Sequence, residues 1–190
     1  LFAMYSDGES GESYMPNNSG IRIYSIDDGA FKYFIPCYAW YNWMTYPMSI
    51  SNDGMIILYR EGYRAFDGIW FRNLTTNEQI PLLTNYNNDS GEYVLSAFSP
   101  NDEQFYIYYP SQNNIDVYST RTLEIIHRFR YDECDDVFWD DSNQICISSR
   151  GNIYSWQISD SHRNCIIPIP SYAEGVRISN DNNYAAAACT

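Results

Sequence analysis

The carboxylates between Tyr131 and Asp141 form the densest group of chemically capable side chains in the sequence. An acidic group of this kind could select a partner that carries Lys or Arg, because opposite charge raises the association rate and the selectivity. Calcium also binds carboxylates, but the D-x-D-x-D-G spacing of a calcium loop is absent. The simpler interpretation is a solvated loop that keeps an acidic protein soluble. The candidates for an acidic pocket are Asp132, Glu133, Asp135 and Asp136.

A second candidate is the aromatic segment CYAWYNWMTY, which begins at Cys37. An exposed aromatic group could anchor a peptide or stack on a cation. The alternative is structural, because large aromatic side chains are usually well buried and would fill the space between packed sheets. We expect Trp40 and Trp43 to be the most exposed of these rings. The candidate binding residues are Trp40, Tyr41, Trp43 and Tyr46.

Signatures of catalysis and of metal binding are scarce. The sequence contains no G-x-S-x-G nucleophile elbow, no phosphate-binding loop and no H-E-x-x-H zinc motif. Its two histidines are His127, which alternates with apolar neighbours, and His162, which lies three residues before Cys165. Zinc takes three or four protein ligands, so a lone His-x-x-Cys does not predict a metal site. We therefore expect no enzyme activity in this region and no cofactor or metal.

The composition is that of an acidic chain rich in aromatic residues. The 190 residues include 11 Lys and Arg against 24 Asp and Glu, which gives a net charge of −13, and 17% are aromatic. Disordered chains contain few aromatics, a membrane span needs about 20 apolar residues, and nucleic-acid binding needs clustered Lys and Arg. The sequence fits none of these classes. Five scattered cysteines without a CxxC pair favour reduced thiols, and with them a cytoplasmic location.

Internal repeats indicate which elements carry the candidate residues. Four stretches begin with Ile, alternate in polarity and end in a polar turn, at spacings of 48, 46 and 38 residues. An apolar strand that ends in an Asx-type turn also recurs, at spacings of 48, 41 and 39 residues counted from Ser51, Ser99, Asp140 and Ser179. Two landmarks that keep the same order and a similar period predict a repeat fold. The first landmark comprises IRIYSIDDG from Ile21, IWFRNLTTN from Ile69, IDVYSTRTL from Ile115 and IYSWQISDS from Ile153.

Each repeat has the pattern of four short strands joined by turns. In the clearest repeat we expect strands at 93–98, 104–109, 114–119 and 124–129. Ile, Val, Tyr and Phe favour a pleated, half-buried surface, and the connecting segments are rich in Pro, Asn, Asp and Ser, which form turns. Four strands in about 40–45 residues is the spacing of a β-propeller blade. Asp140 and Asp141 belong to a repeated turn, so we expect them on the face opposite the acidic pocket.

The segment YVLSAFSPNDEQFYIYYPSQNNIDVYSTRTLEIIHRF, which begins at Tyr93, resembles a WD40 repeat over its whole length, and the resemblance extends more weakly over the chain. An F-S-P-x-D-like turn, an I-x-V-aromatic third strand and a Thr-containing turn carry it. The family's Trp-Asp dipeptide is replaced in every repeat, for example by Tyr118-Ser119, and its Gly-His dipeptide is absent. The resemblance therefore implies a WD40-like propeller without the family's buried Asp-His-Ser-Trp network. TolB-like and peptidase-associated propellers share much of the same pattern.

The predicted fold is all-β, a β-propeller built from four-stranded antiparallel blades. Three complete blades are expected at roughly 47–86, 93–131 and 136–169, with partial blades at 1–36 and 175–190. A closed ring needs four to eight blades, and incomplete end blades expose strand edges that invite pairing with another chain. We therefore favour a fragment of a larger propeller. A half-ring that a partner completes is the alternative.

The resemblance also implies where function would reside. In WD40-type rings the loops between strands two and three, and those between blades, share the face most used for binding. Those loops are 6–20, 37–46, 60–68, 84–91, 110–113 and 131–136. The predicted function is a non-catalytic protein–protein interaction scaffold, part of a larger protein or complex, whose aromatic and acidic loops bind a basic peptide or a partner protein. Direct nucleic-acid binding and membrane insertion are not expected. The alternatives are a substrate-gating propeller of a serine-peptidase-type enzyme and a sensor propeller of a nucleotide-binding switch protein.

Overall fold

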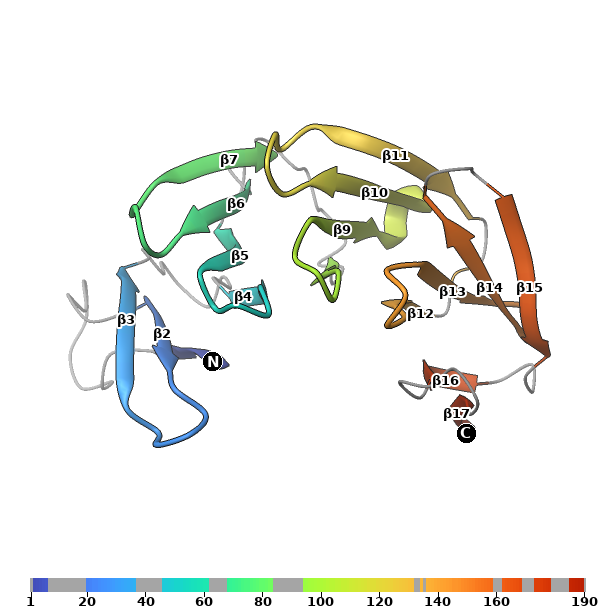
Figure 1. The fold of residues 1–190 in the computed structure, drawn as a ribbon, viewed down its shortest axis with the longest axis horizontal. Helices are drawn as coiled ribbons and strands as arrows, with labels where there is room; N and C mark the ends of the chain where they lie inside the picture. Colours follow the sequence, from blue (N-terminus) through green and yellow to red (C-terminus); the bar gives the residue numbers. More distant parts are fainter. Residues whose placement is uncertain are drawn as a thin grey trace. The chain divides into compact units, whose positions relative to one another are not determined.

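The computed structural model describes residues 2–6, 20–36, 46–61, 68–83, 94–131, 134, 136–158, 162–168, 173–178 and 185–189. The chain divides into two compact units, Leu1–Gly91 and Glu92–Thr190. Apart from one short 3-10 helix, the regular elements of the described ranges are β-strands (Figure 1). No helix within these ranges is long and apolar enough to cross a membrane.

The first unit contains two antiparallel sheets in which consecutive strands are neighbours (Figure 1). One sheet has three strands in the order β1-β2-β3, and the other has four in the order β4-β5-β6-β7. The strands are β1 (Phe2–Ser6), β2 (Gly20–Tyr24), β3 (Phe31–Pro36), β4 (Tyr46–Ile50), β5 (Ile56–Glu61), β6 (Gly68–Asn73) and β7 (Gln79–Leu83).

The second unit contains two four-stranded antiparallel sheets, β8–β11 and β12–β15, and the pair β16–β17. The short helix η1 (Pro110–Gln112) joins β9 to β10. The strands are β8 (Leu95–Phe98), β9 (Gln104–Tyr109), β10 (Asn114–Ser119), β11 (Ile125–Arg130), β12 (Asp136–Trp139), β13 (Ile145–Ser149), β14 (Asn152–Gln157), β15 (His162–Pro168), β16 (Ala173–Ile178) and β17 (Ala185–Cys189).

A hydrophobic core forms within each unit because side chains alternate between the two faces of a strand. In the first unit, Ile21 and Ile23 of β2 pack in one cluster with Ile57 and Tyr59 of β5 and with Leu74. In the second unit, one face of the β8–β11 sheet packs on the β12–β15 sheet. That cluster contains Tyr106, Tyr108, Ile115, Val117, Phe129, Val137, Ile145, Ile147 and Trp156.

The Asx-type turns that follow the first strand of each four-stranded sheet repeat in three dimensions. The Ser51 and Ser99 hydroxyls each accept a hydrogen bond from the backbone N–H five residues ahead, at 2.9 and 3.1 Å. Asp140 fills the same role with Oδ1, which accepts from the N–H groups of Ser142 and Gln144 at 2.9 and 2.8 Å. The predicted turn role of Asp140 is therefore confirmed.

The repeated turns also share a left-handed residue. The fourth residue of each Asx-type turn has positive φ, at Gly54 (73°), Asp102 (56°) and Asn143 (59°). The hairpins that follow β2, β6 and β10 have their own left-handed position, at Gly29 (67°), Asn77 (61°) and Leu123 (58°). Gly, Asn and Asp adopt this conformation readily, whereas Leu does so at a cost.

Three complete four-stranded antiparallel sheets and two smaller ones agree with the predicted fold class. The registers support the same conclusion, because Ile69 pairs with Leu83 in one sheet as Ile115 pairs with Phe129 in the next. The chain is therefore almost entirely β-structure, built from a repeated four-stranded unit.

Candidate functional site

Most of the predicted aromatic site lies outside the described residues. Trp40, Tyr41 and Trp43 belong to the undescribed segment 37–45. Tyr46 is the first residue of β4, and its backbone pairs with Arg60 of β5. The binding role of these four residues therefore stays a prediction.

The predicted acidic pocket is described at one of its four positions. Asp132, Glu133 and Asp135 lie outside the described residues, whereas Asp136 begins β12. The Asp136 side chain is buried, with 8% of the residue exposed, and its Oδ1 accepts a hydrogen bond from the Val137 N–H at 2.9 Å. One oxygen of this carboxylate therefore stabilises the start of a strand. Its role in binding stays a prediction.

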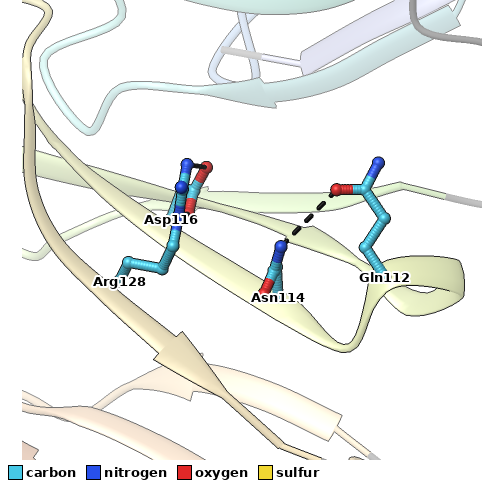
Figure 2. Close-up of polar contacts among 4 residues, drawn as sticks. All are labelled: Gln112, Asn114, Asp116 and Arg128. Carbon is cyan, nitrogen blue, oxygen red and sulfur yellow. Dashed lines mark hydrogen bonds and ion pairs between the residues drawn. The ribbon is translucent and has the colours of Figure 1, made fainter.

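A polar cluster occupies β10 and β11 close to η1 (Figure 2). Arg128 donates from Nε and Nη2 to Asp116 Oδ1 and Oδ2, at 2.5 and 2.8 Å. Asp116 is 5% exposed and the Arg128 side chain 52%, so the buried carboxylate holds a guanidinium that reaches solvent. This hydrogen bond and the charge of Asp116 raise the pKa of Arg128. The pair is a charged cross-link between two neighbouring strands.

The amide side chains beside this ion pair are less completely bonded. Asn114 Nδ2 donates to Gln112 Oε1 at 3.5 Å (Figure 2). Asn114 Oδ1 is buried and has no hydrogen-bond partner in the described part of the chain. Asn114 begins β10, where the equivalent first residues of β2 and β6 are Gly20 and Gly68.

Of the residues that the structure describes, His127 and Cys146 are titratable groups that could serve in catalysis, and both belong to strands. The His127 ring lies 4.2 Å from the Phe129 ring, centroid to centroid, on the outer strand β11. Burial, and to a lesser extent the charge of Asp140, raises the pKa of the Cys146 thiol to about 12. The reactive form of cysteine is the thiolate, so Cys146 is inert at neutral pH. Among the described residues, no group of three His, Cys, Asp or Glu side chains could hold a metal ion.

A groove of about 490 Å³ lies at the opposite corner of the β8–β11 sheet, between the turn after β8 and the turn after β10. The two turns are joined by the Thr120 N–H, which donates to the Glu103 carbonyl oxygen at 2.9 Å. Ile126 of β11 forms an apolar wall and is 44% exposed. The groove is lined by Asp102, Glu103, Gln104, Ser119, Thr120, Arg121 and Ile126.

Two buried oxygen atoms in the groove residues lack partners. Gln104 Oε1 and Thr120 Oγ1 are both buried without a hydrogen bond in the described structure. Most buried polar atoms in proteins have a partner, so these two oxygens mark a corner whose buried polar groups are incompletely bonded. Sequence reasoning missed this corner because it weighed loops by their density of acidic and aromatic residues. The signal was the repeat itself, which aligns Thr120 with Leu74.

Neither protein-family models nor curated protein sequences match this chain. Many solved structures do match. The β-propeller domain of the Trilobed protease from Pyrococcus furiosus has a TM-score of 0.60 at 17% identity, over 82% of this chain and 50% of its own. The Dos1 propeller has a TM-score of 0.62 at 10% identity, over 91% and 45%. KlAtg21, solved with the coiled coil of AgAtg16, has a TM-score of 0.58 at 16% identity, over 86% and 54%.

The chain spans about half the length of these solved propellers. At identities this low the likeness concerns the fold, and the neighbours differ in what they do, since one is part of a protease and another was solved with a protein partner. Their shared architecture agrees with the repeated four-stranded sheets of this chain. The chain therefore has the fold of β-propeller blades.

Proposed function

We propose that this propeller region is a non-catalytic scaffold that binds a protein partner carrying basic residues. The observation that carries the proposal is the display of carboxylates on turns that are themselves fixed by hydrogen bonds. Asp53 shows the arrangement, because its Oδ1 accepts from the Ser51 hydroxyl at 2.6 Å and from the Met55 N–H at 2.8 Å. Such side chains lose little conformational freedom on binding. The exposed carboxylates of the described turns include Asp27, Asp28, Asp53, Glu78 and Glu103.

The charge of the chain and the solved neighbours support a protein partner. A net charge of −13 attracts basic partners at long range and accelerates their association. Atg21 is a propeller that was solved with a coiled coil from another protein. The loops of residues 37–46 and 131–136, which join the other ends of the strands, are a second set of proposed contacts. Trp40 and Trp43 are the proposed anchors, and Asp132, Glu133 and Asp135 the proposed acidic rim, next to the buried Asp136.

A random peptide library displayed on phage, selected against the immobilised 190-residue chain, tests this proposal. Enriched peptides should contain Lys or Arg together with an apolar residue. Their affinity should fall by about 2 kcal/mol or more when Trp43 is changed to Ala, as at other aromatic anchors. Tyr154→Phe, within the β12–β15 sheet, is the matched control. Failure to enrich any peptide, or enrichment of acidic peptides, would contradict the proposal.

The peptidase neighbour supports a second candidate, a propeller that gates access to a catalytic domain. The Trilobed protease of Pyrococcus furiosus contains a β-propeller domain with this fold. In that case the parent protein would carry a Ser-His-Asp domain outside these 190 residues. Labelling of the full-length protein by a fluorophosphonate, which reacts with activated serines, distinguishes the two candidates.

A further inference from the structure

The groove of the β8–β11 sheet has a counterpart in the β4–β7 sheet with the same backbone. In each sheet the residue after the third strand donates its N–H to the fifth residue of the preceding Asx-type turn. The bond runs from Leu74 to the Met55 carbonyl oxygen at 2.7 Å, and from Thr120 to the Glu103 carbonyl oxygen at 2.9 Å. The two corners can therefore be compared position by position.

The side chains at these equivalent positions differ in polarity. Leu74 is 7% exposed and packs in the core of its unit, beside Ile57 and Tyr59. Thr120 takes its place in the β8–β11 sheet, with a buried hydroxyl that has no described partner. Gln104 likewise replaces Ile56, and Glu103 replaces Met55. The corner therefore carries apolar side chains in one sheet and polar ones in the other.

The charges and shape of the groove favour a cation on a flexible aliphatic stem. The carboxyl-bearing Asp102 and Glu103 outnumber the single cation Arg121. The Glu103 carboxylate accepts one hydrogen bond, from Asn101 Nδ2 at 2.9 Å. Lysine packs its methylene stem on apolar surface while its ammonium group donates up to three hydrogen bonds. Ile126 supplies the apolar surface, and the exposed Glu103 carboxylate supplies acceptor oxygens.

We propose that this groove binds a lysine side chain of a partner protein. The proposal rests on the protein-binding function proposed above, and it adds a contact point outside the aromatic and acidic loops. The lysine stem lies against Ile126, and the ammonium group is held by the Glu103 carboxylate. An acidic side chain would meet carboxylates there, and a purely aliphatic one would leave the Glu103 carboxylate without a cation.

Nuclear magnetic resonance of the 15N-labelled 190-residue chain tests the proposal with acetyl-Ala-Lys-Ala-amide as the probe. The control probe replaces lysine by norleucine, which keeps the stem and lacks the ammonium group. We expect saturating shifts at Glu103, Gln104 and Thr120 with the lysine peptide alone, with the roughly millimolar dissociation constant of a small ligand. Equal shifts with both peptides, or no saturating shift with either, would overturn the proposal.

Substitutions locate the contact. Glu103→Gln keeps the shape, removes one charge and should weaken the lysine peptide roughly two- to fivefold, as expected for a partly exposed ion pair. Asp141→Asn removes a comparable exposed charge from the turn of the β12–β15 sheet and should leave the affinity unchanged. If both variants weaken binding of the lysine peptide equally, the attraction is a diffuse charge effect, and the proposal that the groove binds lysine is overturned. An unchanged amide spectrum away from each substitution verifies that the variant is folded.

The test separates this inference from the proposed function. The lysine peptide could show no binding while phage selection still enriches basic peptides whose binding depends on Trp43. In that case only the lysine-binding role of the groove is refuted. If neither kind of peptide binds, the protein-binding function is refuted as well.

Discussion

The β4–β7 and β8–β11 sheets have the same strand order and equivalent turns, yet they differ in the polarity of several equivalent positions, three of which belong to the third strand and the turn after it. In β6 and its following turn these positions hold Gly68, Trp70 and Leu74. In β10 they hold Asn114, Asp116 and Thr120. The backbone of the repeat is therefore compatible with an apolar set and with a polar set. The fold is determined by the features that the two sheets share. The positions that differ between them are available for binding a partner.

The shared features are the turn residues and the central apolar positions. Ser51 and Ser99 make equivalent side-chain-to-backbone hydrogen bonds. Ile69 and Ile115 are both fully buried in the third strand. The polar set of the β8–β11 sheet includes one complete interaction, the ion pair of Asp116 with Arg128, and oxygen atoms without a described partner. Substitutions that exchange features between the two sheets test this division.

The largest expected effect is that of Leu74→Thr in the β4–β7 sheet. It removes a buried apolar side chain from the core of the first unit and places a hydroxyl there. The free energy of unfolding should fall by about 2–4 kcal/mol, measured by urea denaturation. Leu82→Thr, on the partly buried outer strand β7, is the control and should cost less. A loss below about 1 kcal/mol for Leu74→Thr would mean that this corner is not a packed core.

Arg128→Met should destabilise the β8–β11 sheet by about 1–2 kcal/mol. The substitution leaves the buried Asp116 carboxylate without its two hydrogen bonds, while the exposure of Arg128 to solvent limits the loss. Arg130→Met on the same strand removes an exposed cation and should change stability by less than about 0.5 kcal/mol. Thermal unfolding of the two variants compares them directly. Equal effects would show that the ion pair is not a specific cross-link.

Leu123→Gly should stabilise the chain by about 0.5–1 kcal/mol. Leu123 has a φ of 58° at the position that Gly29 and Asn77 occupy in the equivalent hairpins, and glycine relieves the left-handed strain. Leu123→Ala shortens the side chain and keeps the strain, so it should give no gain. Chemical denaturation distinguishes the two substitutions, and a gain with alanine equal to that with glycine would refute the strain.

The smallest expected effect concerns Asp28, in the turn between β2 and β3. The Ala30 N–H donates to its Oδ1 at 2.9 Å, and this bond, with contributions from Ser25 and Lys32, lowers the pKa of the carboxyl group. A lowered folded-state pKa adds stability above the unfolded-state value, and that stability is lost as the pH falls through the folded-state value. Titration of the carboxyl carbon resonance should give a midpoint below the ordinary aspartate value, and Ser25→Ala should raise it. A midpoint at or above the ordinary aspartate value would contradict the assignment.

The sequence predicted the repeated part of this structure well, because strands and turns have local signatures. The strand NIDVYS was predicted at 114–119 and is found there, although four consecutive residues of it are buried and burial does not alternate. The turn at Ser99 was predicted from the hydrogen-bonding capacity of its side chains, and the structure contains it. The Asp116–Arg128 pair could not be predicted in the same way. It depends on how β11 pairs with β10. A register shift between Val117 and Tyr118 decides which residue of β11 lies opposite Asp116.

The candidate site was predicted less well for a different physical reason. Density of acidic and aromatic residues identifies loops that can bind, but a buried oxygen without a partner depends on packing in three dimensions. Thr120 has an ordinary turn sequence around it, and only its alignment with the buried Leu74 shows that a polar atom occupies a core position. Comparison between repeats is therefore more informative here than composition.

The most direct test of this account transfers the apolar corner of the β4–β7 sheet to the β8–β11 sheet. The triple variant Glu103→Met, Gln104→Ile and Thr120→Leu carries the residues of positions 55, 56 and 74. Titration of the native chain and the variant with the lysine peptide should show binding to the native chain alone. The variant should also unfold at a higher denaturant concentration, because the buried unpartnered oxygens are gone. Equal binding of the peptide to both proteins would contradict the account.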